Sequence, residues 1–122
     1  MTTLKMNARG AMRPRAYRTS QPSVRQKRWR EEVRALGSII SGGPAVIHHA
    51  VGRTAKHDRI EIGHWFILPL TELEHRAMHR NQCRKVSEKE WFTVLIQKYV
   101  NVYGKPSPVP DDVYKAIREY HR

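Results

Sequence analysis

The chain has 122 residues, which is the length of one ordinary domain and leaves no room for two independent hydrophobic cores. It carries 23 Lys and Arg against 11 Asp and Glu, and the resulting net charge of +12 predicts a polyanionic partner, with nucleic acid favoured over a membrane surface. No run of 18 apolar residues and no signal-peptide core are present, so we expect a cytoplasmic protein without a membrane partner. The single cysteine, Cys83, excludes an intrachain disulfide and zinc modules built on cysteine pairs.

Residues 1–21 make up a basic segment that we expect to be a disordered arm. The segment has no acidic residue and too few apolar side chains to form a core. Its cations, which we expect to contact nucleic acid, are Lys5, Arg9, Arg13, Arg15 and Arg18.

A first helix is predicted over residues 22–36. Trp29, Val33 and Leu36 recur at the spacing of one helix face, and Gly37 follows at the expected end of the helix. The opposite face is basic, and its Arg25 and Arg28 are candidate nucleic-acid contacts.

The middle of the chain predicts a strand, a loop, a second strand and a helix. "AVIHHAV" and "HWFILPL" are short apolar runs joined by the polar stretch "GRTAKHDRIEIG". Thr71 and Glu74, three residues apart, have the pattern of a capping box and start a helix directly after the second run. The expected unit is therefore a hairpin with a long loop followed by a helix.

The C-terminal third predicts two packing helices within residues 87–121. Ser87 and Glu90 repeat the capping box, and the helix after them carries apolar residues at core spacing, namely Trp91, Phe92, Leu95, Ile96 and Tyr99. The last helix begins at Asp111 and Asp112 and turns Val113, Ile117 and Tyr120 inward. We therefore expect an α+β fold in which residues 22–122 form one domain, with a strand-strand-helix core over about 44–82.

His75 and His79 are four residues apart on the predicted helix, which stacks their rings on one face. Most single histidines lie in a core or on a solvated surface. Here, however, the apolar residues Leu73 and Ala77 point to a different side of the helix, so His75 and His79 form a stripe separate from the apolar one. Two imidazoles so placed can share a metal ion, and His48 or His49 can supply a third ligand from the strand. Because neighbouring strand residues face opposite ways, only one of the doublet should turn to the metal, and the other is free to activate water.

These residues resemble the HNH, or ββα-metal, nucleases, whose site is a hairpin and a helix around one divalent ion. The order "HH", then roughly two dozen residues, then "HxxxH" is similar to the all-histidine version in nuclease bacteriocins. The stretches "IHHAVGRT" and "HWFILPLTELEH" resemble the phage recombination-enhancement nucleases, over about residues 44–80.

The resemblance implies a metal-dependent DNA endonuclease. In this reading His48, His75 and His79 bind one divalent ion (Zn²⁺, Mn²⁺ or Mg²⁺), which contacts the scissile phosphate and the leaving oxygen, and His49 is the general base. Three imidazoles favour Zn²⁺, Ni²⁺ or Mn²⁺ over Mg²⁺. DNA is the expected partner, and the phage resemblance adds a host recombinase filament as a further one.

The sequence departs from the family at two points. It lacks the cysteine pairs that hold a structural zinc in many members, so helix capping and the C-terminal helix must hold the hairpin. It also has no Asn between residues 50 and 80 to orient the base, and His64 is the candidate substitute, with a surface strand-end residue as the alternative.

The loop after the doublet contains two further cations, Arg53 and Lys56, that we expect to contact phosphate beside the scissile bond, the alternative being ordinary surface cations. Arg53 is included among the catalytic residues. His57 and Asp58 in the same loop are interpreted as solvated and are not assigned to the site.

Two other classes of function fit parts of the sequence. A non-catalytic DNA-binding module would keep the ββα shape and bind DNA with a steep salt dependence but cut nothing. A basic structural protein would need no metal for its stability. The enzyme is favoured because His49 is redundant in a purely structural three-histidine site.

Deletion of residues 1–20 should weaken DNA binding and flatten its salt dependence. The deletion removes five cations, and each phosphate contact adds about 0.9 to the slope of log affinity against log salt, so the slope should fall by up to about four or five. Binding titrations at several salt concentrations measure it. Metal binding and cleavage at low salt should survive, and an unchanged slope would mean that the arm serves another partner.

Overall fold

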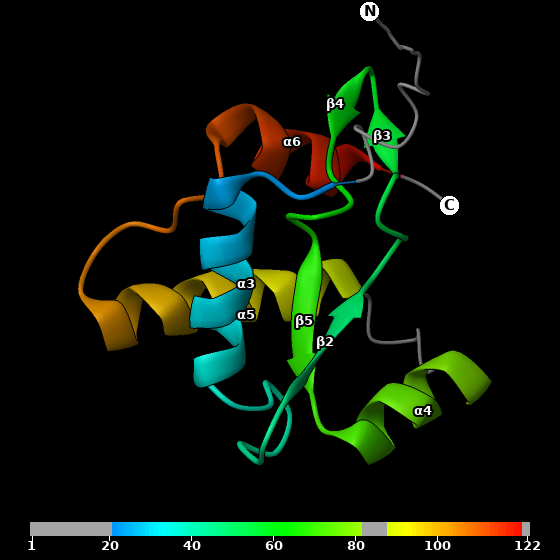
Figure 1. Cartoon of the computed structure of the whole chain (residues 1–122), viewed down its shortest axis with the longest axis vertical. Helices are drawn as coiled ribbons and strands as arrows, with labels where there is room; N and C mark the ends of the chain where they lie inside the picture. Colours follow the sequence, from blue (N-terminus) through cyan, green and yellow to red (C-terminus); the bar gives the residue numbers. More distant parts are fainter. Residues whose placement is uncertain (1–20, 82–87, 121–122) are drawn as a thin grey trace, which may run out of the picture.

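The computed structural model describes residues 21–81, with side chains up to residue 78, and residues 88–120. This part of the chain has the expected α+β fold, with four helices and two small antiparallel sheets (Figure 1). The elements in chain order are α3 (Val24–Ala35), β2 (Val46–His49), β3 (Lys56–His57), β4 (Ile60–Glu61), β5 (Ile67–Leu70), α4 (Glu72–Asn81), α5 (Glu88–Tyr103) and α6 (Asp111–Glu119). Residues 1–20 of the predicted arm, and Ser87, lie outside the described residues.

Helix α3 confirms the first predicted helix to within two residues at each end. Its N-cap is Ser23, whose hydroxyl accepts from the Gln26 backbone N–H while the Gln26 side chain accepts from the Ser23 N–H. Trp29 and Val33 are fully buried. The helix ends before Gly37, which has a φ of +82° that only glycine adopts without strain.

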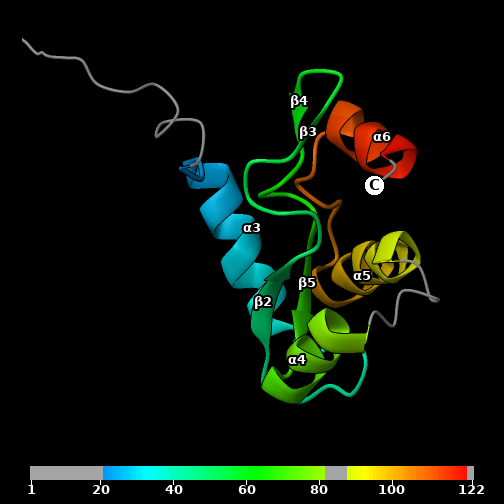
Figure 2. The ribbon, with the colours of Figure 1, turned by 90° about the vertical axis from the view of Figure 1, so that its right-hand side faces the viewer.

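Strands β2 and β5 form the predicted antiparallel hairpin, in the register His48 opposite Leu68 and His49 opposite Ile67. All four residues of β5 are buried, as expected for a strand covered on both faces. Figure 2 shows α3 on one side of the sheet and α4 and α5 on the other. The sheet is therefore the middle layer, and its two faces meet different helices.

The segment between the two strands was expected to be a polar loop, and this expectation is incomplete. Residues 56–61 form a second, smaller hairpin from β3 and β4. Asp58 and Arg59 make its turn with φ values of 51° and 69°, the left-handed geometry of a tight two-residue hairpin turn. This inner hairpin packs against α6 at the end of the molecule away from α4 (Figure 1).

The capping box at the start of α4 is present as predicted. The Thr71 N–H donates to Glu74 Oε1 over 2.8 Å, and the Glu74 N–H donates to Thr71 Oγ1 over 3.2 Å. The Ser38 hydroxyl also donates to Glu74 Oε1, over 2.5 Å. Burial alone would raise the pKa of Glu74, but these hydrogen bonds outweigh it and hold the pKa below its ordinary value. Glu74 thus joins the start of α4 to the segment that follows α3.

Helices α5 and α6 supply the packing surface that was predicted for them. Phe92, Leu95 and Tyr99 of α5 are buried, and so are Val113 and Ile117 of α6. The Tyr99 hydroxyl donates to Glu32 Oε1 over 2.8 Å, which ties α5 to α3 across the core.

Replacement of Glu74 by Ala should lower the free energy of unfolding by about 1–2 kcal/mol, because it removes both the cap and the acceptor for Ser38. Urea denaturation measures this loss. The control is Glu72→Ala in the same turn, where the exposed side chain forms an ion pair with Arg76 at 3.6 Å, so the loss should be about 0.5 kcal/mol or less. Equal losses in the two variants would contradict the role of the capping box.

Candidate metal and nucleic-acid site

His48 lies on the face of β2 that meets α4 and α5. Its side chain is almost completely buried, and its ring contacts the ring of His75 on α4 edge to face, with 5.1 Å between the ring centres. The structure thus brings together two of the three predicted metal ligands, from a strand and from the helix that follows the hairpin.

The spacing of these two rings fits a shared metal ion. Zinc and similar ions bind imidazole nitrogen at about 2.0–2.1 Å, so two imidazoles on one tetrahedral ion have ring centres about 5 Å apart. The observed 5.1 Å matches this value.

The third predicted ligand, His79, is one helical turn after His75 in α4, and its side chain lies outside the described part of the structure. On the same helix Leu73 is 73 % exposed. Leu73 therefore does not anchor α4 to the rest of the protein. The capping box and the contact of His75 with His48 help to position the helix instead.

Glu88, the first residue of α5, is a site residue that sequence reasoning missed. Its Oε2 lies 2.8 Å from Nε2 of His48, and its side chain is only 20 % exposed. The contact joins residues that are 40 positions apart in the chain. No local pattern around Glu88 could have revealed it, because it depends on how α5 crosses the sheet.

His49 faces the other side of β2, as strand alternation predicts. Its ring lies edge to face against the ring of His64, with 5.8 Å between the ring centres. His64 is only 6 % exposed, so the alternative of a surface strand-end residue is wrong. The doublet therefore belongs to two separate histidine pairs, His48 with His75 and His49 with His64.

The surroundings of His49 keep its ring neutral. Burial is the main cause that lowers the pKa of His49 from the ordinary 6.5 to about 4. His64, Arg53 and Arg30 lower the pKa further, because each disfavours a second positive charge beside it.

Gly63 explains how His64 reaches His49. A Cβ at this position would overlap the backbone carbonyls of Gly52 and Arg53, so the chain approaching β5 passes directly against the chain leaving β2. Only glycine permits this contact. The close approach sets His64 beside His49 and holds the backbone of Arg53 next to both.

Two arginines border the His49 pair. Arg53 was predicted and is exposed, whereas Arg30 on α3 was not assigned to the site. Arg30 was missed because its place depends on α3 packing over β2, which the periodicity of α3 alone does not specify. Lys56 is exposed in β3, which is the next strand after β2 in the chain.

The other predicted nucleic-acid contacts lie elsewhere. Arg25 donates to the backbone oxygen of Pro108 over 3.2 Å and lies over the ring of Trp65 at 5.9 Å, so it also has a structural role. Arg28 is exposed on α3. Arg13, Arg15 and Arg18 lie outside the described residues.

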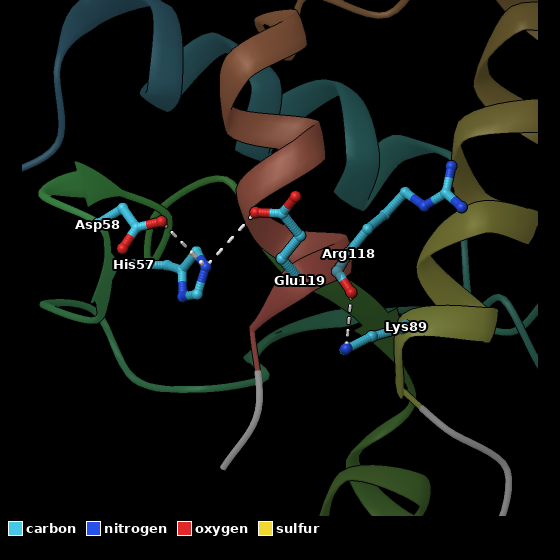
Figure 3. Close-up of polar contacts among 5 residues, drawn as sticks. All are labelled: His57, Asp58, Lys89, Arg118 and Glu119. Carbon is cyan, nitrogen blue, oxygen red and sulfur yellow. Dashed lines mark hydrogen bonds and ion pairs between the residues drawn. The ribbon is translucent and has the colours of Figure 1, made fainter.

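His57 and Asp58, interpreted as solvated from the sequence, form a cluster with Glu119 of α6 (Figure 3). His57 Nε2 lies 3.5 Å from Asp58 Oδ2 and 3.6 Å from Glu119 Oε1, and the ring is partly buried. The two carboxylates are 80 % and 51 % exposed. The cluster links the inner hairpin to α6. Asp58 is solvated as expected, whereas His57 is partly buried and contacts both carboxylates.

Comparison with protein-family models, curated proteins and solved structures gives no match for this chain. Across residues 21–81 and 88–120, every helix is too short or too polar to cross a membrane. We therefore infer the function from the chemistry of the two histidine pairs.

The stability of the metal-free protein should fall as the pH drops from 6.5 toward about 4. In this window the unfolded chain protonates residue 49 and the folded chain does not, so acid favours unfolding. After allowance for solvent screening at the partly exposed ring, the loss should be about 1–2 kcal/mol. Urea denaturation in EDTA at several pH values should show a shallower decline for His49→Asn, and identical declines would contradict the lowered pKa.

Proposed function

We propose that this protein is a metal-dependent DNA endonuclease of the HNH type, which hydrolyses phosphodiester bonds. The observation that carries the proposal is the His48–His75 pair between β2 and α4, with spacing that fits one shared ion, directly beside the His49–His64 pair. The hairpin followed by α4 has the order of the ββα-metal unit. The parts that this chemistry needs are the buried His48 in contact with His75 and, at the next residue, the neutral His49 beside two arginines.

His48, His75 and His79 would hold the divalent ion. The two described rings approach each other from different elements and leave part of the coordination sphere to other groups. A divalent ion bound there would supply charge neutralisation at the phosphate and stabilisation of the departing oxygen.

His49 would take the proton from the attacking water. Its ring is neutral near pH 7, which a proton acceptor must be. A DNA phosphate beside the ring would raise its pKa, because the anion offsets the charges of Arg53 and Arg30 that lower it. Bound substrate would thus raise the basicity of the His49 ring. His64 would orient this ring through their edge-to-face contact.

Arg53 and Arg30 would bind the phosphates on either side of the scissile bond. Both lie close enough to His49 to lower its pKa, so a phosphate held by them would be next to the base. Lys56, Arg28 and the predicted arm would extend this basic track along the DNA, consistent with the net charge of +12.

The resemblance to phage recombination-enhancement nucleases suggests a cellular setting. We propose that the enzyme acts in the cytoplasm of a bacterial host on DNA that is being recombined or processed. A host recombinase filament is the protein partner that this setting would supply.

Replacement of His49 by Ala should abolish cleavage and leave metal affinity nearly unchanged, because the base does not touch the ion. We expect a loss of about 10²–10⁴-fold in the rate of plasmid nicking. The assay is incubation of supercoiled plasmid with Mg²⁺, Mn²⁺, Zn²⁺ or EDTA, combined with calorimetric titration of the metal.

His75→Ala is the comparison variant, and it should weaken metal binding by orders of magnitude because a ligand is lost. Cleavage by His49→Ala at the wild-type rate would exclude the general base. DNA binding without cleavage by the wild-type protein, with any of the three ions, would identify the non-catalytic module instead.

A further inference from the structure

His57, Asp58 and Glu119 gather three potential metal ligands at the end of the molecule away from α4 (Figures 1 and 3). Their ligand atoms, one from each side chain, all lie within 4.8 Å of one another. The first two residues belong to the inner hairpin, and the third is the last residue of α6. The packing of α6 against the hairpin therefore assembles the set, which shares no residue with the two histidine pairs.

The two contacts of the His57 ring are longer than ordinary hydrogen bonds. Nε2 lies 3.5 Å from Asp58 Oδ2 and 3.6 Å from Glu119 Oε1, whereas such hydrogen bonds are about 2.7–3.2 Å long. Two ligands on one tetrahedral ion, with bonds of about 2.0–2.2 Å, are about 3.4 Å apart. Both separations therefore match ligands that share a zinc ion better than they match direct hydrogen bonds.

The charges around the cluster favour a cation. Among the residues with described side chains, each carboxylate forms its ion pair with the His57 ring and not with a Lys or Arg. Arg118, the neighbour of Glu119, lies over the ring of Tyr114 at 5.9 Å and points away from the cluster (Figure 3). Glu119 also ends α6, where the partial negative charge of the helix end disfavours a carboxylate. A divalent ion would offset both carboxylates and the helix end.

The His57 ring is positioned by further packing. It is partly buried, and it lies edge to face against the ring of Tyr120, with 6.2 Å between the ring centres. Tyr120 directly follows Glu119, so the end of α6 positions both the imidazole and one of the carboxylates. The ring is therefore oriented with Nε2 toward the two oxygen ligands before any ion binds.

We propose that His57, Asp58 and Glu119 bind a zinc ion that joins the inner hairpin to α6. Imidazole nitrogen and carboxylate oxygen are both ligands of Zn²⁺, and three protein ligands leave a fourth position for water. The nitrogen ligand makes Ca²⁺ and Mg²⁺, which take oxygen ligands, a poorer fit. This ion is separate from the one in the proposed function, and its binding does not depend on that function.

The test is a Zn²⁺ titration of the full chain, followed by NMR of the histidine ring nitrogens. This measurement reports on each histidine separately, so Zn²⁺ bound at His48 and His75 does not obscure the result. We expect a saturable shift of the His57 Nε2 resonance in the wild-type chain, because this nitrogen would bind the ion. EDTA should reverse the shift.

Two variants test the oxygen ligands. Asp58→Asn and Glu119→Gln each remove one negative charge, and Asn tolerates the left-handed geometry of the turn. Each variant should need at least about tenfold more Zn²⁺ for half of the His57 shift. The control is Asp111→Asn, which removes the same charge from the exposed first turn of α6 and should leave the His57 titration unchanged.

The outcomes separate this inference from the proposed function. If Zn²⁺ shifts the His48 or His75 resonances and leaves His57 unchanged, the site at α6 is wrong and the proposed metal centre stands. An equal His57 titration in the wild-type chain and every variant would mean that the imidazole binds Zn²⁺ without the carboxylates, which also overturns the site. A shift of His57 alone, weakened in Asp58→Asn and Glu119→Gln, would support this site and contradict the proposed nuclease centre.

Discussion

The antiparallel pairing of β2 with β5 decides which way each histidine of the doublet faces. With His48 opposite Leu68 and His49 opposite Ile67, the pleat sends the first ring toward α4 and α5 and the second toward α3. A slip of one residue would exchange the two faces and bury His49 beside His75. The complete burial of β5 opposes such a slip, since its side chains already fill both layers.

The two faces give adjacent residues opposite electrostatic surroundings. His48 meets the carboxylate of Glu88, which suits a cation, whereas His49 meets Arg53 and Arg30, which suit an anion. In the proposed function, these surroundings would attract a metal ion to one side of the strand end and a phosphodiester to the other. The thickness of a single β-strand separates the group that would hold the metal from the group that would accept a proton.

Patterns within a segment were enough to predict much of this arrangement. Strand alternation separates His48 from His49, helical spacing places His75 on one face of α4, and the Thr71–Glu74 box marks where α4 begins. The inner hairpin was not predicted because its turn at Asp58 and Arg59 lacks the glycine that normally marks a left-handed turn.

Contacts between distant segments could not be predicted in this way. Glu88 and Arg30 reach the site only because α5 and α3 cover opposite faces of the sheet, and neither residue has a local signature. The exposure of Leu73 is a related case, since an apolar residue at helical spacing is buried only if another element covers that face. Tertiary packing, not local preference, decides all three positions.

The inner hairpin also affects the order in which the chain can assemble. Pairing β2 with β5 directly would require closing the whole intervening loop, whereas β3 and β4 close over a two-residue turn. Once the inner pair has formed, the ends of the outer pair are already near each other, and less chain entropy remains to be lost on closure. The nesting therefore allows the closure that costs less chain entropy to come first and the pairing of β2 with β5 to follow it.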